Sequence, residues 1–67
     1  QGEKMHIPDR VVVGADGATI IDYKTGNEMP KYKEQVNTYA KLLAEVGLTV
    51  NKKVIFYTAT QKAEVWQ

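Results

Sequence analysis

Alternation and clustering of apolar residues predict two strands in the first third of the chain. The segment Met5–Val13 is rich in Ile and Val and stops at GADG, residues 14–17, a sequence typical of a turn. The segment Ala18–Lys24 has the same apolar character, so the two segments predict an antiparallel hairpin. Because Pro8 has no N–H, the first strand is expected to be an edge, a bulge or a strand end at that point.

A period of about 3.6 residues between apolar positions predicts one helix over Pro30–Val46. Proline at the first helical position and Gly47 just after the last are typical of helix boundaries. Lys52–Thr58 predicts a third strand, and Lys62–Trp66 predicts a fourth that pairs with it across residues 59–61. The expected buried stripe of the helix consists of Tyr32, Val36, Tyr39, Ala40, Leu43 and Val46.

This order of elements predicts an α+β fold: a β-hairpin, one helix and two further strands. The helix is expected to pack on one face of a single mixed sheet. With 67 residues the chain is at most one domain, and a chain of this size buries only about 60% of its unfolded surface.

The composition of the chain excludes several kinds of functional site. There is no cysteine, hence no disulfide and no thiolate metal site, and with a single histidine a zinc site would need carboxylates. The net charge of +1 is far from the basic excess of many nucleic-acid-binding domains, so such a role has to depend on local placement of charge. No apolar run approaches the roughly 18 residues of a membrane span, and the polar N-terminal residues do not form a signal peptide. A cytoplasmic location with no membrane contact is the resulting expectation.

The stretch IIDYKTG, residues 20–26, places charge where a strand interior would be apolar. Asp22 and Lys24 are two residues apart and therefore share a face. If Val13 faces Ala18 across the turn, paired residues place Asp9 opposite Asp22. Each even-length loop considered puts Asp9, Asp22 and Lys24 on one face, whereas a three-residue loop or a bulge at Pro8 breaks this arrangement.

Two facing carboxylates repel each other and need a compensating charge. A divalent cation such as Mg²⁺, which accepts one or two carboxylates plus water and phosphate, is one compensator, and Lys24 is another. A lysine at such a site can stabilise charge that develops on a phosphate. The alternative from spacing alone is structural, since aspartates at hairpin ends and lysines on wet faces are ordinary.

Three motifs in order resemble the PD-(D/E)XK nuclease superfamily, and in particular its RecB/AddA-like exonuclease branch. They are IPDR at residues 7–10, IIDYKTG at residues 20–26, and QVNTYAKLL at residues 35–43. The resemblance implies a partial restriction-endonuclease-like core and a DNA exonuclease that depends on Mg²⁺ or Mn²⁺. It also implies a place in DNA repair or recombination, next to the helicase part of the same parent chain.

The same resemblance implies a role for each matching residue. Asp9 and Asp22 would be metal ligands, and the backbone carbonyl of Tyr23 would complete the metal site. Lys24 would be the catalytic lysine. Gln35 and Tyr39, one helical turn apart, would position the phosphodiester.

One family element is expected to be missing. Members usually have a helix upstream of this region that gives a further Glu or His to the metal site, whereas only residues 1–4 precede the first predicted strand here. Glu3 is not expected to replace that residue. The chain therefore resembles the C-terminal part of a nuclease domain, and apolar surface left without the helix would favour self-association.

The remaining residues with functional chemistry have simpler interpretations. Strand parity predicts that His6 and Arg10 point away from the Asp9 face, His6 as a surface or packing residue and Arg10 as a solvated charge. Tyr32 and Tyr57 are expected in or near the core, and Trp66 as a packing anchor. Two hypotheses therefore stand: a metal-dependent nuclease, and a non-catalytic interaction or structural domain that keeps the nuclease scaffold.

Overall fold

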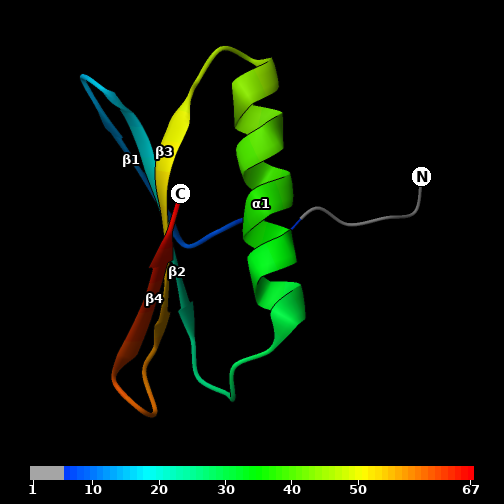
Figure 1. Cartoon of the computed structure of the whole chain (residues 1–67), viewed down its shortest axis with the longest axis vertical. Coiled ribbons are helices and arrows are strands. Elements are labelled where there is room, and N and C mark those ends of the chain that lie inside the picture. The colour runs from blue at the N-terminus through cyan, green and yellow to red at the C-terminus, as the bar shows by residue number, and fades with distance from the viewer. Residues whose placement is uncertain (1–5) are drawn as a thin grey trace.

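The computed structural model of the chain describes residues 6–67, which form one mixed sheet with one helix on it. Strands β1 (Arg10–Gly14) and β2 (Gly17–Lys24) form a hairpin, and α1 (Pro30–Glu45) follows. Strands β3 (Val50–Tyr57) and β4 (Lys62–Trp66) form a second hairpin. Figure 1 shows α1 standing alongside the sheet, with the strands together on the other side. The predicted α+β class and the single mixed sheet are confirmed.

The strand order in the sheet is β1-β2-β3-β4. β2 and β3 are parallel and are joined through α1, whereas each hairpin is antiparallel. Val13 pairs with Ala18 and Gly14 with Gly17, which is one of the even-length registers considered from the sequence. The parallel pair places the ends of β2 and β3 together, with Lys24 beside Tyr57.

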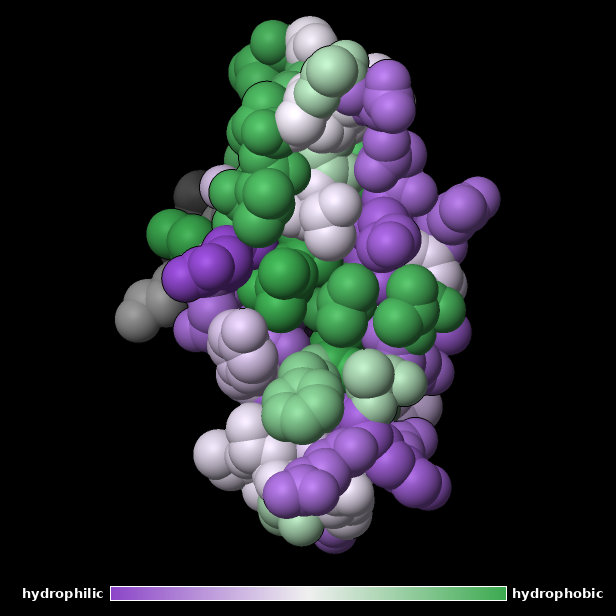
Figure 2. Space-filling model, turned by 90° about the vertical axis from the view of Figure 1, so that its left-hand side faces the viewer, coloured by the Kyte–Doolittle hydropathy of each residue, from purple (hydrophilic) through white to green (hydrophobic). Residues whose placement is uncertain are grey.

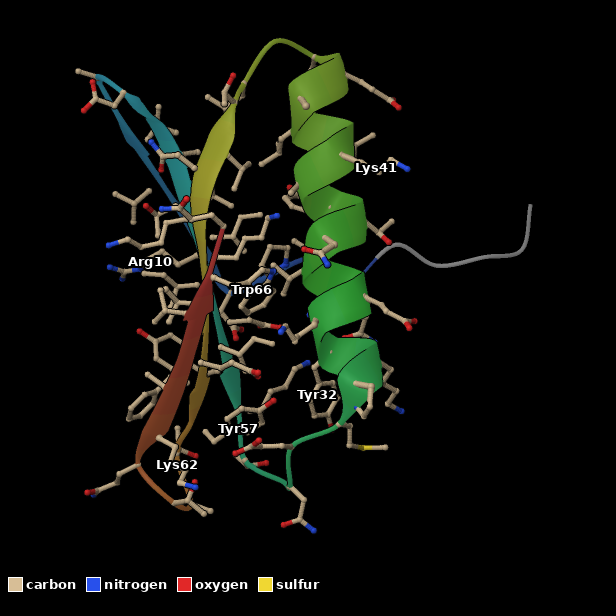
Figure 3. The ribbon with its side chains drawn as sticks, viewed as in Figure 1. Arg10, Tyr32, Lys41, Tyr57, Lys62 and Trp66 are labelled. Atoms are coloured by element: carbon tan, nitrogen blue, oxygen red, sulfur yellow. The ribbon has the colours of Figure 1, made fainter. Side chains whose placement is uncertain are left out.

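The core lies between the sheet and α1. Its buried members are Ala18, Ile20, Val36, Ala40, Ile55 and Tyr57. The burial of alternate residues along β2 follows from the period of two, because only every second side chain faces the helix. Figure 3 shows Tyr32, Tyr57 and Trp66 in the layer between sheet and helix, as expected for packing residues, and Arg10 pointing the other way.

The opposite face of the sheet has no helix over it within residues 6–67. Ile21, Val54 and Val65 lie in one row across it, and Tyr23 and Phe56 lie in the next. The rings of Tyr23 and Phe56 meet edge to face, with centroids 6.2 Å apart. Figure 2 shows this open face, where apolar side chains form a band across the sheet. No helix of the described chain has the length and apolar character needed to span a bilayer.

Three predicted boundaries are corrected by the structure. The first strand begins at Arg10 and not at Met5, which lies outside the described residues, because Pro8 cannot supply the N–H that would extend the ladder. The third strand begins at Val50, two residues earlier than predicted. Val46 caps the helix and is 74% exposed, so it does not belong to the buried stripe. Gly47 follows with φ +96°, the left-handed conformation that ends many helices.

Candidate active site at the end of the second strand

Asp22 occupies a core position of β2. It alternates with Ala18 and Ile20 on the face that α1 covers, and only 1% of it is exposed. A carboxylate buried among apolar residues costs several kcal/mol of free energy unless charged or hydrogen-bonding groups compensate it. The neighbours of Asp22 must therefore account for its presence there.

Two nitrogen donors compensate the buried carboxylate. His6 Nε2 lies 2.8 Å from Asp22 Oδ2, and Lys24 Nζ lies 3.3 Å from the same oxygen. Burial alone raises the pKa of Asp22, but hydrogen bonding with Asp9 and His6, together with the charge and hydrogen bond of Lys24, outweighs it and lowers the pKa below its usual value. Asp22 is therefore an ionised, acceptor-only group at neutral pH.

Asp9 lies beside the end of β2, although it is not part of the ladder. Its Oδ2 accepts a hydrogen bond of 2.8 Å from the Tyr23 amide. Along β2 the backbone groups of Ala18 and Lys24 point to the β3 side, so those of Tyr23 point to the β1 side. Pro8 would be the next ladder partner of Tyr23 and has no N–H to offer its carbonyl. The Asp9 carboxylate and the Tyr23 carbonyl are thus directed to the same side of β2.

Lys24 is held by its backbone and by an aromatic ring. Its carbonyl accepts a hydrogen bond of 2.9 Å from the Thr58 amide, which fixes the end of β2 against β3. Its Nζ lies 4.5 Å from the centroid of the Tyr32 ring, within the range of a cation–π contact. Sequence reasoning assigned Tyr32 to packing alone. Its place one turn before Gln35 on the same helix face was the available signal that it borders the site.

Gln35 and Tyr39 lie on α1 and are both half-buried. Neither forms a hydrogen bond with Asp9, Asp22 or Lys24 in the part of the chain that the structure describes. Tyr39 packs against the hydrophobic core. The Gln35 Oε1 atom is buried and has no hydrogen-bond partner among residues 6–67, a state that costs about 1–3 kcal/mol and suits an acceptor awaiting a donor.

The prediction for His6 was wrong. It assumed strand parity from residue 5 onwards, but residues 6–9 precede β1 and do not alternate as a strand does. The segment bends so that the His6 ring reaches the covered face, whereas Arg10, the first residue of β1, is exposed as expected. The prediction for Glu3 falls outside the described residues.

The oxygen donors at the end of β2 are of the type that a hard divalent cation prefers. Within residues 6–67 no group of three or more His, Cys, Asp or Glu side chains converges as a metal site. Two carboxylates do lie together, and Mg²⁺ commonly takes one or two of them with water and phosphate. The His6 and Lys24 contacts both fall on Asp22 Oδ2, so Oδ1 is the oxygen through which Asp22 can bind a cation without breaking them. The Tyr23 carbonyl is a third oxygen of the preferred kind.

One surface cleft has a volume of about 340 Å³ and lies where α1 begins, between Glu28, Met29, Pro30, Lys33, Tyr57 and Glu64. None of the residues predicted for the site lines it.

Comparison with known proteins identifies the family but no individual relative. No curated protein and no solved structure shows significant similarity to the chain. The family model of the PD-(D/E)XK nuclease superfamily matches residues 7–67, which include Asp9, the DYKTG stretch and all four strands. The chain therefore belongs to the PD-(D/E)XK nuclease superfamily.

Proposed function

We propose that the chain is the metal-dependent catalytic part of a DNA nuclease that hydrolyses phosphodiester bonds. The observation that carries the proposal is the buried, ionised Asp22 with Lys24 Nζ at 3.3 Å and Asp9 beside it, in a chain of this superfamily. A core position held by a carboxylate is difficult to explain by stability alone, because an apolar residue there would avoid the desolvation cost.

Asp9 and Asp22 hold the cation in this proposal, with the Tyr23 carbonyl as a further oxygen ligand. A bound Mg²⁺ or Mn²⁺ supplies Lewis-acid stabilisation of phosphoryl oxygens and lowers the pKa of the attacking water. Lys24, fixed by Thr58 and by the Tyr32 ring, presents its ammonium group to the charge that develops on the phosphate.

Gln35 and Tyr39 position the substrate from α1. They lie one turn apart on the helix face that covers the sheet, and the free Gln35 Oε1 is an acceptor for a donor on the substrate or its water. Tyr32 belongs with them, because its ring already contacts Lys24.

The finer assignment is an exonuclease of the RecB/AddA-like branch that acts in DNA repair or recombination. DYKTG at residues 22–26 together with glutamine and tyrosine at helix positions 35 and 39 supports this branch. We propose that the helicase part of the same parent chain delivers the DNA end, and that the compartment is the cytoplasm.

A cleavage assay tests the function. Linear DNA with either end labelled, single-stranded and duplex, and a closed single-stranded circle are incubated with Mg²⁺ and with the wild-type chain or a variant. Lys24→Met is expected to lower the rate about 100-fold or more, since it removes the charge at the phosphate. Lys41→Met, an exposed lysine that points away from the sheet, is the matched control and keeps the wild-type rate (Figure 3).

Equal rates for the wild type and Lys24→Met contradict the catalytic site. Cleavage of the closed circle would support the nuclease proposal and contradict the exonuclease assignment, because a circle has no end.

The alternative role, a non-catalytic interaction domain, is favoured by the open face of the sheet. Val12, Tyr23 and Val65 are 47%, 49% and 56% exposed on that face. Such a face supports self-association, which sedimentation over a range of protein concentrations measures. A concentration-dependent dimer that leaves DNA intact favours this alternative over the nuclease.

A further inference from the structure

His6 enters the site from outside the regular elements. It lies four residues before β1, and the buried Pro8 between them anchors the segment against the protein. The His6 side chain is 29% exposed, and its Nε2 lies 2.8 Å from Asp22 Oδ2. This distance is shorter than the 3.3 Å between Lys24 Nζ and the same oxygen.

The chemistry of the contact fixes which group donates. A carboxylate oxygen accepts hydrogen bonds, so the His6 ring carries a hydrogen on Nε2 and donates it to Oδ2. Lys24 donates to the same oxygen over the longer distance of 3.3 Å. Two donors from separate segments therefore determine how the carboxylate plane is turned.

We propose that His6 is a positioning residue for the cation site. This inference rests on the proposed function. By holding Oδ2 of Asp22, His6 turns Oδ1 toward Asp9 and a divalent cation. It also occupies part of the acceptor capacity of Oδ2, which would otherwise be available to Lys24.

Loss of the His6 hydrogen bond has two consequences. Asp22 is free to rotate, which costs affinity for the cation, because partners that orient a ligand typically contribute 10- to 100-fold in metal binding. Lys24 becomes the remaining nitrogen donor at Oδ2 among the described residues, so it is drawn toward Asp22 and away from the phosphate.

The test compares Mn²⁺ dissociation constants of the whole chain, measured by titration calorimetry, for the wild type, His6→Leu and His6→Gln. His6→Leu removes the donor and is expected to weaken binding about 10-fold or more. His6→Gln keeps an N–H at similar reach and is expected to restore affinity to within about 3-fold of the wild type. Ile7→Ala, an exposed neighbour at 70%, is the control and keeps wild-type affinity.

A second readout needs neither metal nor a variant at residue 6. The nitrogen spectrum of the wild-type His6 ring in its neutral form is expected to show the hydrogen on Nε2. A hydrogen on Nδ1, with a bare Nε2 facing Asp22, overturns the inference.

The outcomes separate this inference from the proposed function. If the wild type binds Mn²⁺, Asp22→Asn does not, and His6→Leu binds as the wild type does, the role of His6 is refuted and the metal site stands. The role is also refuted if His6→Gln is as weak as His6→Leu. If the wild type binds no Mn²⁺, the proposed function fails and the role of His6 fails with it.

Discussion

Acidification should destabilise the protein through Asp22 in particular. The pKa of this carboxyl is lowered in the folded state, because hydrogen bonding with Asp9 and His6 and the charge and hydrogen bond of Lys24 outweigh the opposing effect of burial. A lowered pKa means that the unfolded chain takes up the proton first as the pH falls. The contribution of Asp22 to stability is therefore complete above its unfolded pKa of about 3.9, and it is lost as the pH falls through the folded value.

The size of this contribution follows from the geometry. A unit charge pair at the 3.3 Å of Lys24 and Asp22 is worth about 5 kcal/mol at an effective dielectric constant of about 20. Desolvation of the buried carboxylate opposes this with a cost of several kcal/mol. The direction of the pKa shift shows that the attraction outweighs the desolvation. At pH 3 the unfolded pKa of about 3.9 limits the loss of stability from this one carboxyl to about 1.3 kcal/mol.

Urea unfolding of the wild type and of Asp22→Asn, at pH 6 and at pH 3, measures the contribution of Asp22 to the free energy of unfolding. The remaining carboxylates titrate in both proteins. The loss of stability between pH 6 and pH 3 in the wild type, minus the same loss in Asp22→Asn, therefore reports on Asp22 alone. The wild type is expected to lose more stability than the variant on acidification, by at most about 1.3 kcal/mol. If Asp22→Asn loses as much as the wild type, or if the wild type gains stability, the proposed electrostatics of the cluster are wrong.

Three further predictions concern the scaffold that positions the site. Gly17→Ala should lower the free energy of unfolding by about 2–3 kcal/mol, because φ at this residue is +131° and a Cβ would lie 2.7 Å from a backbone carbonyl oxygen. The control Gly26→Ala places its Cβ in open space and should leave the free energy of unfolding nearly unchanged in the same denaturation assay. Ile55→Ala empties a fully buried position and should cost about 2–5 kcal/mol, while Val65→Ala on the open face should change unfolding by less than about 0.5 kcal/mol; equal losses would contradict the assignment of the two faces. Trp66→Phe removes the 3.0 Å hydrogen bond from Nε1 to Oδ1 of the helix asparagine and should cost about 0.5–1 kcal/mol, and a double-mutant cycle with alanine at that asparagine should show the coupling.

The fold could largely be predicted because its signals are local. GADG predicted the turn of the first hairpin and left a choice of even-length registers, and proline and glycine marked the two ends of α1. The pairing of β2 with β3 was harder to predict from the sequence, because a parallel pair joined through a helix has no turn sequence that marks it. Val50 and Asn51 also lack a sequence pattern that would predict a strand on their own.

Site geometry was predictable only where strand periodicity applied. Parity placed Asp22 and Lys24 on one face, and the structure shows them in contact. His6 was missed because it precedes the strand, where no period governs direction. The contact between Lys24 and Tyr32 depends on how a long side chain folds back, which sequence spacing does not report. The roles of Gln35 and Tyr39 remain predictions.

The central claim is that the end of β2 binds a divalent cation through Asp9 and Asp22. The most direct measurement adds trace Mn²⁺ to the isotopically labelled chain in millimolar Mg²⁺ and follows the broadening of each backbone amide signal. We predict selective broadening around Asp9, Asp22 and Tyr23 that disappears in Asp22→Ala. Broadening spread over the exposed acidic residues, or broadening at these three positions that persists in Asp22→Ala, would contradict the account.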